Sequence, residues 1–325
     1  MSTVSIEVIA QAAGVSPATV SRVFNRRPYV KECLSRRVLA AARRLDYRPP
    51  VVARRRTVSI VMTNSNITGN SYEASMLGSF FSAASQLNFN VEFVPLQNLD
   101  QVYRNFSDAV IAMVYSEAAA DSLRQLTEMP VITINYQTAG CHYVCTDHRG
   151  GASQATEYLI RHGHRRIGIL LAPFEEHMSW GEKARFTGYR KALASHDCQF
   201  DPNLVFYGTV SRIKELPSML QRDKPTALLV CGENLVVPVW HQLLHAGYRI
   251  PDDLSLITYY QPTVTPFLYP EPTCLVQEYD HITRLTMENL QRLLAGECQK
   301  IELMIDNSFL TGQSVRHLDT QALPA

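Results

Sequence analysis

The sequence lacks the features of a membrane-spanning or disulfide-stabilised protein. Among its 325 residues no apolar run is long enough to cross a bilayer, and the amino terminus has no apolar core of a signal peptide. Its seven cysteines are odd in number and are scattered between Cys33 and Cys298, which favours reduced thiols over a disulfide framework. We therefore expect a cytoplasmic protein that makes no contact with a membrane.

Signatures of common catalytic and cofactor sites are also absent. The sequence contains no nucleophile elbow and no glycine-rich phosphate loop. Cys141 and Cys145 have His142 and His148 nearby, but their spacing matches no common zinc pattern. We expect no metal and no cofactor, and an enzyme on an α/β scaffold is the weakest alternative.

Positive charge is concentrated at one end of the chain. Residues 1–57 contain twelve Lys and Arg against three acidic residues, so this segment is near +9 although the whole chain is only +1. The remaining residues, 58–325, hold 19 basic and 27 acidic residues and are near −8. This segregation predicts a polyanion partner for the basic segment, with salt-sensitive binding.

Two short helices are predicted within that basic segment. Ser5 can cap a helix over residues 6–13, and Gly14 then allows a tight turn. Ser16 can cap a second helix that begins at Pro17, where a missing amide hydrogen costs nothing. Two helices joined by a short glycine-containing turn form a helix-turn-helix unit, although an ordinary helical hairpin in a core is the alternative.

The second predicted helix has one face suited to the major groove of DNA. Val20, Val23 and Phe24 recur at spacings of three and four residues and form its apolar face. The opposite face is small and hydroxylated, with Arg22 as its one long cation. Small residues permit close approach, hydroxyls reach phosphates, and an Arg can donate two hydrogen bonds to guanine. This face predicts double-stranded DNA as the partner.

The stretch AGVSPATVSRVFN, followed by PYV and RRVLAAARRLDYRPP, resembles the amino-terminal DNA-binding domain of the LacI (lactose repressor) family of bacterial transcription regulators. The resemblance implies that Pro17 and Ala18 distinguish one operator from another and that Arg22 reads a base. It also implies a third helix over about 32–45. Phosphate contacts are implied for Ser5, Ser16, Thr19, Ser21, Asn25 and Tyr47.

Residues 47–57 are predicted to be a hinge. In the family this segment forms a short helix on DNA and pushes a Leu into the minor groove. Here Arg56 stands where that Leu is expected, and the link to the first strand is shorter than usual. We expect Arg54, Arg55 and Arg56 to contact a narrow minor groove by electrostatics, without an apolar wedge.

Beyond the hinge, apolar runs alternate with helical stretches in two series, which predicts two parallel sheets covered on both faces. The first series has strands at 58–62, 90–96, 108–114, 130–135 and 143–147, with helices at 72–87, 99–106 and 118–127. The second has strands at 166–172, 204–208, 227–232 and 254–259, with helices at 185–194, 213–221 and 235–245. His162 and His164 are expected in a structural turn before the second series.

RHGHRRIGIL, RFTGYRKAL and GYRIPDDLSLITYY match the regulatory domain of the same family, whose fold is shared with periplasmic sugar-binding proteins. The resemblance implies an all-α helix-turn-helix domain followed by an α/β two-lobed domain of two doubly wound parallel sheets, with ligands held in the cleft between lobes. The expected boundaries are 1–46 for the DNA-binding domain, 47–57 for the hinge and 58–325 for the two lobes. The amino lobe is expected at about 58–160 plus 277–304, and the carboxyl lobe at about 161–276 plus 305–325.

The resemblance also implies an effector site. Arg185 stands where the family anchors small effectors, and its planar guanidinium suits hydroxyls, carboxylate or phosphate; a salt bridge on the lobe surface is the alternative. Asp147 and Tyr72 match two further positions of the family's effector site. Two positions depart from the pattern, because Tyr260 replaces an acidic residue and Glu233 replaces an Asp.

Trp180 offers a stacking surface at this site, although core packing is the more common role of such a residue. A site that loses a strong acceptor and gains aromatic surface predicts a small polar effector, a sugar or a related metabolite. We expect a repressor that binds a palindromic operator as a homodimer and associates with the nucleoid when bound to DNA. The alternatives are a regulator that is independent of an effector or controlled by a protein partner, and a plain solute-binding protein, which the basic segment disfavours.

Overall fold

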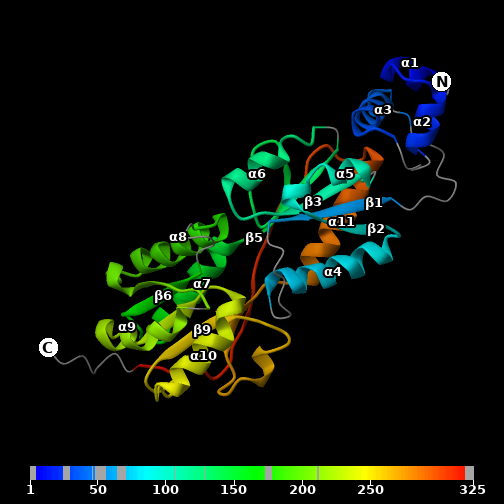
Figure 1. Ribbon diagram of the computed structural model, residues 1–325. Helices are drawn as coiled ribbons and strands as arrows, with labels where there is room; N and C mark the ends of the chain where they lie inside the picture. Colours follow the sequence, from blue (N-terminus) through cyan, green and yellow to red (C-terminus); the bar gives the residue numbers. More distant parts are fainter. Residues whose placement is uncertain are drawn as a thin grey trace. The chain divides into compact units, whose positions relative to one another are not determined.

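A computed structural model of the chain divides into two compact units (Figure 1). The first unit comprises Met1–Ser65, Phe80–Tyr143 and Arg284–Glu302, and the second comprises Asn66–Ser79, Val144–Thr283 and Leu303–Ala325. The structure describes residues 5–24, 30–45, 47, 56–63, 71–105, 107–127, 129–172, 178–210 and 212–318.

The first unit begins with three helices packed around a small apolar core. They are α1 (Ile6–Ala13), α2 (Pro17–Phe24) and α3 (Glu32–Arg44), which confirms the three predicted helices. The core consists of Ile9, Ala10, Ala13, Val20, Val23, Val38, Ala41 and Ala42. Each helix therefore buries only one stripe, and the opposite face of α2 is left to solvent.

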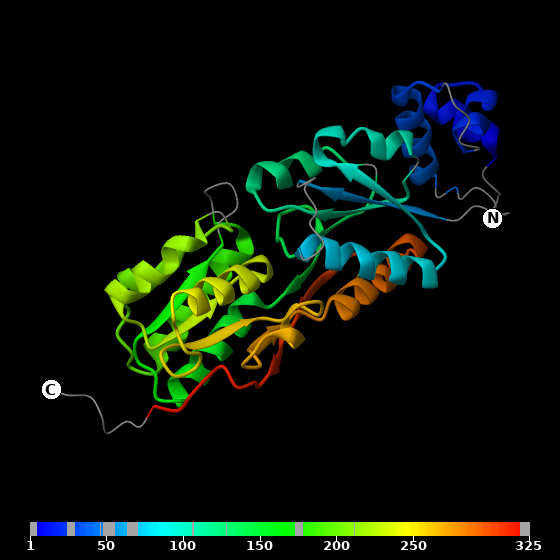
Figure 2. The same ribbon diagram turned by 60° about the horizontal axis from the view of Figure 1, so that its bottom comes forward.

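The first sheet has the strand order β11-β5-β4-β3-β1-β2, and its described pairs β1–β2, β1–β3 and β3–β4 are parallel. Its strands are β1 (Thr57–Met62), β2 (Asn90–Pro95), β3 (Ala109–Met113), β4 (Val131–Ile134), β5 (His142–Thr146) and β11 (Glu302–Ile305). The associated helices are α4 (Tyr72–Gln86), α5 (Gln101–Arg104), α6 (Glu117–Leu123) and α11 (Tyr279–Ala295), with a 3-10 turn at Leu96–Asn98. In Figures 1 and 2 α4 and α11 run side by side.

The second sheet has the strand order β12-β10-β9-β8-β6-β7, with only β12 antiparallel to its neighbour among the described pairs. Its strands are β6 (Ile167–Leu171), β7 (Val205–Tyr207), β8 (Ala227–Val230), β9 (Ser255–Tyr259), β10 (Thr273–Val276) and β12 (Ser308–Leu310). Its helices are α7 (His148–Arg161), α8 (Trp180–Ser195), α9 (Leu216–Asp223) and α10 (Val236–His245), with 3-10 turns at 202–204, 213–215, 233–235 and 265–267. Two parallel-dominated sheets confirm the predicted fold class.

Helices cover both faces of the second sheet. Alternate strand residues point to opposite sides, so Ile169 and Leu171 pack with α7 and α8, whereas Leu170 packs with α9 and α10. The crossing of α7 and α8 is close, because a Cβ at Gly188 would collide with the backbone carbonyl of Arg149. Only glycine fits at that crossing.

Two helices differ from the sequence-based expectation. No helix is predicted at 148–161, yet α7 forms there and contributes Ala152 and Leu159 to the same core as β6. The second unit includes the chain from Val144 to Thr283, and therefore α7, while the predicted lobe boundaries near residues 160, 276 and 305 stay predictions. The chain also passes between the two units at 65–66, 79–80, 283–284 and 302–303. Helix α8 begins at Trp180, ahead of the predicted start at Arg185, because the Ser179 hydroxyl caps it.

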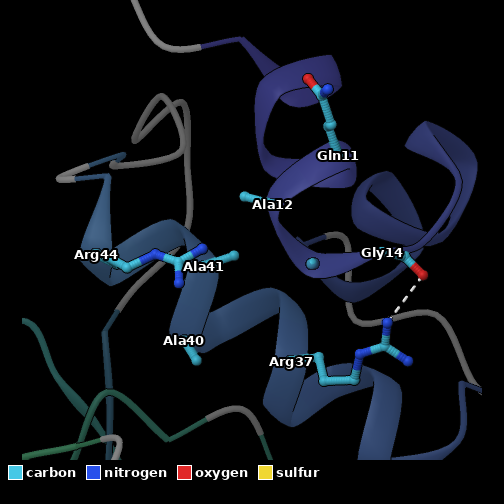
Figure 3. Close-up of a pocket in the computed structure, with 8 residues that line it drawn as sticks. Gln11, Ala12, Gly14, Arg37, Ala40, Ala41 and Arg44 are labelled. Carbon is cyan, nitrogen blue, oxygen red and sulfur yellow. Dashed lines mark hydrogen bonds between the residues drawn. The ribbon is translucent and has the colours of Figure 1, made fainter.

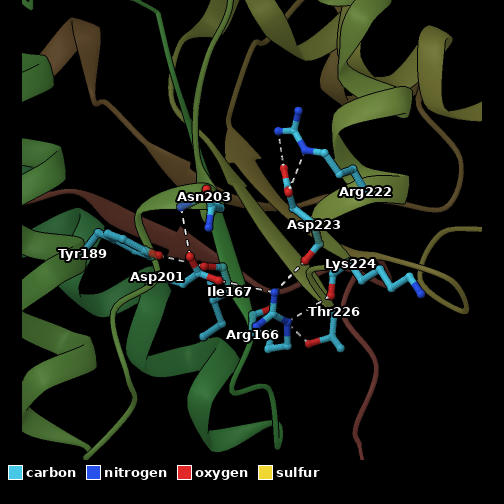
Figure 4. A network of polar contacts seen from close by, with 9 residues as sticks. All are labelled: Arg166, Ile167, Tyr189, Asp201, Asn203, Arg222, Asp223, Lys224 and Thr226. Carbon is cyan, nitrogen blue, oxygen red and sulfur yellow. Dashed lines mark hydrogen bonds and ion pairs between the residues drawn. The ribbon is translucent and has the colours of Figure 1, made fainter.

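The amino-terminal edge of the second sheet is held by structural hydrogen bonds. Arg166 donates to the Asp223 carbonyl (2.6 Å) and lies 3.4 Å from an Asp201 carboxylate oxygen (Figure 4). His164 is fully buried in the predicted turn, with Nδ1 3.0 Å from the Thr226 hydroxyl and Nε2 3.2 Å from the Arg316 carbonyl. Burial lowers the pKa of His164 to about 4. This histidine is a neutral structural residue.

His164 should make the second unit sensitive to acid. Its folded pKa, about 4, lies below the ordinary value of 6.5, so its stabilising contribution is present above pH 6.5 and is lost as the pH falls toward 4. We expect the free energy of unfolding to fall by roughly 2 kcal/mol more in the wild type than in His164→Gln between pH 7 and pH 5. Urea unfolding at both pH values measures this. The exposed His245→Gln is the control, and equal losses in wild type and His164→Gln would contradict the assignment.

DNA-reading helices and candidate effector site

The start of α2 is organised by two hydroxyl side chains. Ser16 Oγ accepts a hydrogen bond from the Thr19 backbone amide (3.1 Å) and lies 2.9 Å from the Thr19 hydroxyl, which confirms that Ser16 caps this helix. Pro17, Ala18 and Arg22 are exposed, while Val20 is buried. The residues expected to read bases thus lie on the solvent side of α2, opposite its packed side.

Ser5 does not cap α1. It occupies the cap position, but its side chain makes no hydrogen bond to the helix amides. Its hydroxyl instead hydrogen-bonds the Glu7 carboxylate and lowers the pKa of Glu7. The capping prediction was wrong because an ionised carboxylate in the first turn is a stronger partner for a hydroxyl than a backbone amide.

The remaining predicted DNA contacts are only partly described. Tyr47 stacks on Phe24, with ring centroids 5.5 Å apart, so its ring closes the edge of the three-helix core. The Arg56 carbonyl accepts a hydrogen bond from the Asn90 amide (2.7 Å), which pairs the backbone at Arg56 with β2. Three further residues predicted to contact DNA, Asn25, Arg54 and Arg55, lie outside the described residues.

A hollow of about 470 Å³ lies between α1 and α3 (Figure 3). Its walls include Ala12, Ala40 and the side chains of Arg37 and Arg44. Arg37 donates to the Gly14 carbonyl (3.0 Å), where α1 ends in a left-handed conformation with φ of 60°. The third helix therefore holds the turn that sets the start of α2.

Replacing Gly14 should loosen this turn. Gly14→Ala places a Cβ against the Arg37 guanidinium and forces a left-handed backbone on alanine, at a cost of roughly 1–2 kcal/mol. We expect faster hydrogen exchange in residues 6–24 and no change in the second unit. Gly14→Asn, which tolerates that backbone better, should show a smaller effect. Equal exchange in wild type and Gly14→Ala would disprove this role.

The second unit contains a buried polar cluster built around Arg185. Arg185 lies on α8 and is 7% exposed. Its Nε donates to the Tyr259 hydroxyl (3.0 Å), and its Nη1 donates to a Glu182 carboxylate oxygen (2.7 Å). The salt bridge left open as an alternative does form, but it is buried and not on the surface.

Glu182 is the partner that sequence reasoning missed. It is 3% exposed, and its second carboxylate oxygen accepts a hydrogen bond from the Ala172 amide at the end of β6 (3.3 Å). Burial raises the pKa of Glu182, while the Arg185 charge opposes that rise. The available signal was its position three residues before Arg185 on one helix.

Glu233 anchors a second group of polar contacts. Its carboxylate accepts hydrogen bonds from the Gln277 amide and from the Tyr279 hydroxyl (3.3 Å). Gln277 in turn accepts from the Thr146 hydroxyl (3.1 Å), and burial raises the pKa of Tyr279. Tyr72 meets the Tyr279 ring edge-on, with centroids 5.8 Å apart. Residues far apart in the chain thus converge on one carboxylate.

Trp180 lies beside a histidine that the sequence did not mark as an effector residue. The centroids of the Trp180 and His148 rings are 5.9 Å apart. His148 is 3% exposed, and its Nδ1 has no hydrogen-bond partner among the described residues. A Cβ at Gly181 would lie 3.0 Å from His148, so the missing side chain gives the imidazole its room. Burial and the nearby Arg185 charge lower the pKa of His148 and keep it neutral.

Asp147 and Tyr260 have other surroundings. The Asp147 carboxylate accepts a hydrogen bond from the Gly150 amide (2.8 Å) and caps α7. Tyr260 lines an open pocket of about 470 Å³ together with Ser75, Gln277 and Tyr279. Tyr260 therefore lies near Gln277 and Tyr279, the residues that contact Glu233. The Asp147 carboxylate, in contrast, is already engaged in capping α7.

The cluster lies where parallel strands end. Tyr259 is the last residue of β9. The other three residues follow the ends of their strands: Ala172 follows β6, Glu233 follows β8 and Gln277 follows β10. The carboxyl ends of neighbouring parallel strands meet at one edge of a sheet, and ligands of open α/β sheets bind at that edge. This edge can offer a ligand charged, hydroxyl and aromatic groups at once.

Two protein-family models match this chain, one at its amino-terminal helices and one over much of the remainder. The model of the lacI family of bacterial regulatory proteins matches residues 5–50, and that of the periplasmic binding protein-like domain matches residues 156–315. The chain belongs to the LacI family. It is a DNA-binding transcription regulator and not an enzyme, because its curated relatives across most of its length are transcriptional repressors.

Among these relatives, the Bacillus subtilis (strain 168) protein named "Probable HTH-type transcriptional repressor ExuR" is 27% identical and covers 98% of this chain and 100% of its own. The repressor PurR of Haemophilus influenzae (strain PittEE) is 26% identical, with 84% and 86% covered. A structure of the regulator CelR in complex with cellobiose has 25% identity, a TM-score of 0.71, and covers 96% of this chain and 99% of its own. A structure of the lac repressor dimer bound to operator has the same fold, with a TM-score of 0.72, 19% identity, and 97% and 100% covered.

None of the helices described for this LacI-family chain has the length and apolar character that a bilayer crossing requires.

Proposed function

We propose that this LacI-family protein is a repressor that binds a palindromic operator as a homodimer and responds to a small polar effector, a sugar or sugar derivative. The observation that carries the proposal is the buried polar cluster at the carboxyl ends of the second sheet, on a chain that begins with a helix-turn-helix unit. The cellobiose complex of CelR and a ribose-bound relative from Enterococcus faecium support a sugar-like effector. The protein would act in the cytoplasm, on the nucleoid.

Three functional segments follow from this proposal. Residues 1–46 read the operator, residues 47–57 form the hinge, and the rest of the chain forms two lobes. The second lobe begins before α7, as the core shared by α7 and β6 supports. An effector that binds one of two conformations more tightly changes operator affinity by that difference, typically about 1–3 kcal/mol.

Pro17, Ala18 and Arg22 would contact base edges, because they are exposed on the solvent side of α2. Ser16 and Thr19 would hold phosphates at its start, as would Ser5, Ser21, Asn25 and Tyr47 around it. Arg54, Arg55 and Arg56 would lie over the minor groove. The effector would contact Arg185, Glu233, Trp180, Tyr72 and Tyr260, with Asp147 beside them.

Arg22→Ala should cost roughly 1–3 kcal/mol on the cognate operator and relax the preference at one base pair, because a bidentate contact to a base is lost. Operator selection followed by fluorescence anisotropy at fixed salt measures both effects. Arg212→Ala, an exposed arginine of the second unit, controls for the loss of one charge. An equal loss on random DNA would show that Arg22 only holds a phosphate.

The second unit exposes large apolar side chains that suit a homodimer contact. Phe267 and Tyr269 are 83% and 84% exposed on one loop, and Leu244 on α10 is 49% exposed. Trp240 Nε1 donates to the Tyr269 carbonyl (3.1 Å), so the loop is tied to α10. Large apolar groups held outward on an ordered surface favour a protein partner.

Phe267→Ser combined with Tyr269→Ser should shift the protein toward monomer in sedimentation velocity and weaken binding to a full palindrome. Binding to an isolated half-site should not change, because one helix-turn-helix unit reads it. Tyr207→Ser, an exposed aromatic on β7, is the control. Unchanged sedimentation of the double variant would place the dimer contact elsewhere.

A further inference from the structure

The charge of Arg185 is already neutralised inside the protein. Its Nη1 lies 2.7 Å from a Glu182 oxygen, and both side chains are almost completely buried, at 7% and 3% exposed. Water screens such a pair weakly, so a ligand anion would have to compete with a carboxylate that is already in place.

Glu182 is also fixed from its other side. Its second oxygen accepts the Ala172 amide of the β6 end (3.3 Å), so turning away from Arg185 would break two hydrogen bonds at once. The cap from Ser179 to the Glu182 amide (3.2 Å) holds the backbone of the same turn. The carboxylate therefore belongs to the site and stays there when a ligand enters.

The cluster carries more negative than positive charge. Glu182 and Glu233 supply two carboxylates, and Arg185 supplies the one guanidinium among the described residues that bond directly to them. Arg185 also feels the Glu233 charge. His148 adds no compensating charge, because it is neutral. The excess negative charge of the cluster would repel a phosphate or carboxylate group that entered it.

The groups that still have hydrogen-bonding capacity suit a neutral ligand. Arg185 Nη2 donates to no described residue, and His148 Nδ1 has no partner among the described residues. A hydroxyl can accept from the first and can donate to or accept from the second. The Trp180 ring beside His148 offers an apolar face of the kind that packs on a sugar ring.

We propose that Glu182 is a specificity-determining residue which makes this site selective for an uncharged, polyhydroxylated effector over phosphorylated or carboxylated analogues. This inference rests on the proposed effector function and narrows it to one ligand class. His148 is the further residue that contacts the effector.

Calorimetric titration of the full-length protein with matched ligand sets tests the ligand class. Each set contains a neutral sugar with its phosphate and, for hexoses, its uronate: glucose, glucose 6-phosphate and glucuronate; galactose, galactose 1-phosphate and galacturonate; ribose and ribose 5-phosphate. We expect a neutral member to bind at least about tenfold more tightly than its charged analogues. Tighter binding of a phosphate or a uronate would overturn the inference but leave the effector function standing. Binding by no member, with operator binding intact, would overturn the effector function and this inference together.

Glu182→Gln tests the residue itself. Glutamine has the same size but carries no charge, and its single acceptor oxygen can accept from Arg185 or from Ala172 but not from both. Affinity for the charged members relative to the neutral one should therefore rise about tenfold or more. Glu215→Gln, an exposed glutamate on the 3-10 turn before α9, should leave the ratio unchanged. An unchanged ratio in Glu182→Gln would overturn the role of Glu182.

A conservative variant guards against loss of folding. Glu182→Asp keeps the negative charge, and it should keep the preference for neutral ligands even if it weakens binding overall. A charged-ligand preference in Glu182→Asp as strong as in Glu182→Gln would show that shape and not charge sets the selectivity. Operator binding and the unfolding temperature of each variant report whether it is folded.

Discussion

The buried pair of Arg185 and Glu182 is the interaction on which the effector end of the second unit depends. Leaving either charge unpaired in this interior would cost about 3–5 kcal/mol. Because Arg185 also donates to the Tyr259 hydroxyl and Glu182 accepts from the Ala172 amide, the pair ties α8 to the ends of two strands. One electrostatic requirement thus positions a helix, two strand ends and the polar groups offered to a ligand.

The basic amino-terminal segment and the acidic remainder of the chain serve different ligands. The basic residues gather near the amino terminus, where α2 exposes Arg22 and begins at the exposed Ser16. The net acidic remainder carries the buried polar cluster, in which the Arg185 guanidinium is already paired with the Glu182 carboxylate. The basic amino-terminal segment attracts a polyanion, whereas the polar cluster around Arg185 disfavours anions. DNA and effector therefore do not compete for the same surface.

Sequence reasoning failed where a neighbour outside the local pattern decided the outcome. Ser5 has the right spacing for a cap, but the Glu7 carboxylate takes its hydroxyl. Helix α7 has two glycines in its first turn, and glycine has a low helix propensity, so the sequence did not predict a helix there. Packing against α8 through Gly188, together with the Asp147 cap, compensates for that weak propensity.

The sequence by itself determined the reading helices, the family and the two alternating strand-helix series, because these depend on local periodicity, turns and the distribution of charge. It also marked Arg185 and Glu233 as candidate effector residues. Only the tertiary structure decided their partners. Gln277 reaches Glu233 across 44 positions of the chain, and the Nδ1 of His148, beside Trp180, has no hydrogen-bond partner within the part of the chain that the structure describes. Such pairings follow from which strand ends become neighbours in a sheet, and no local pattern carries that information.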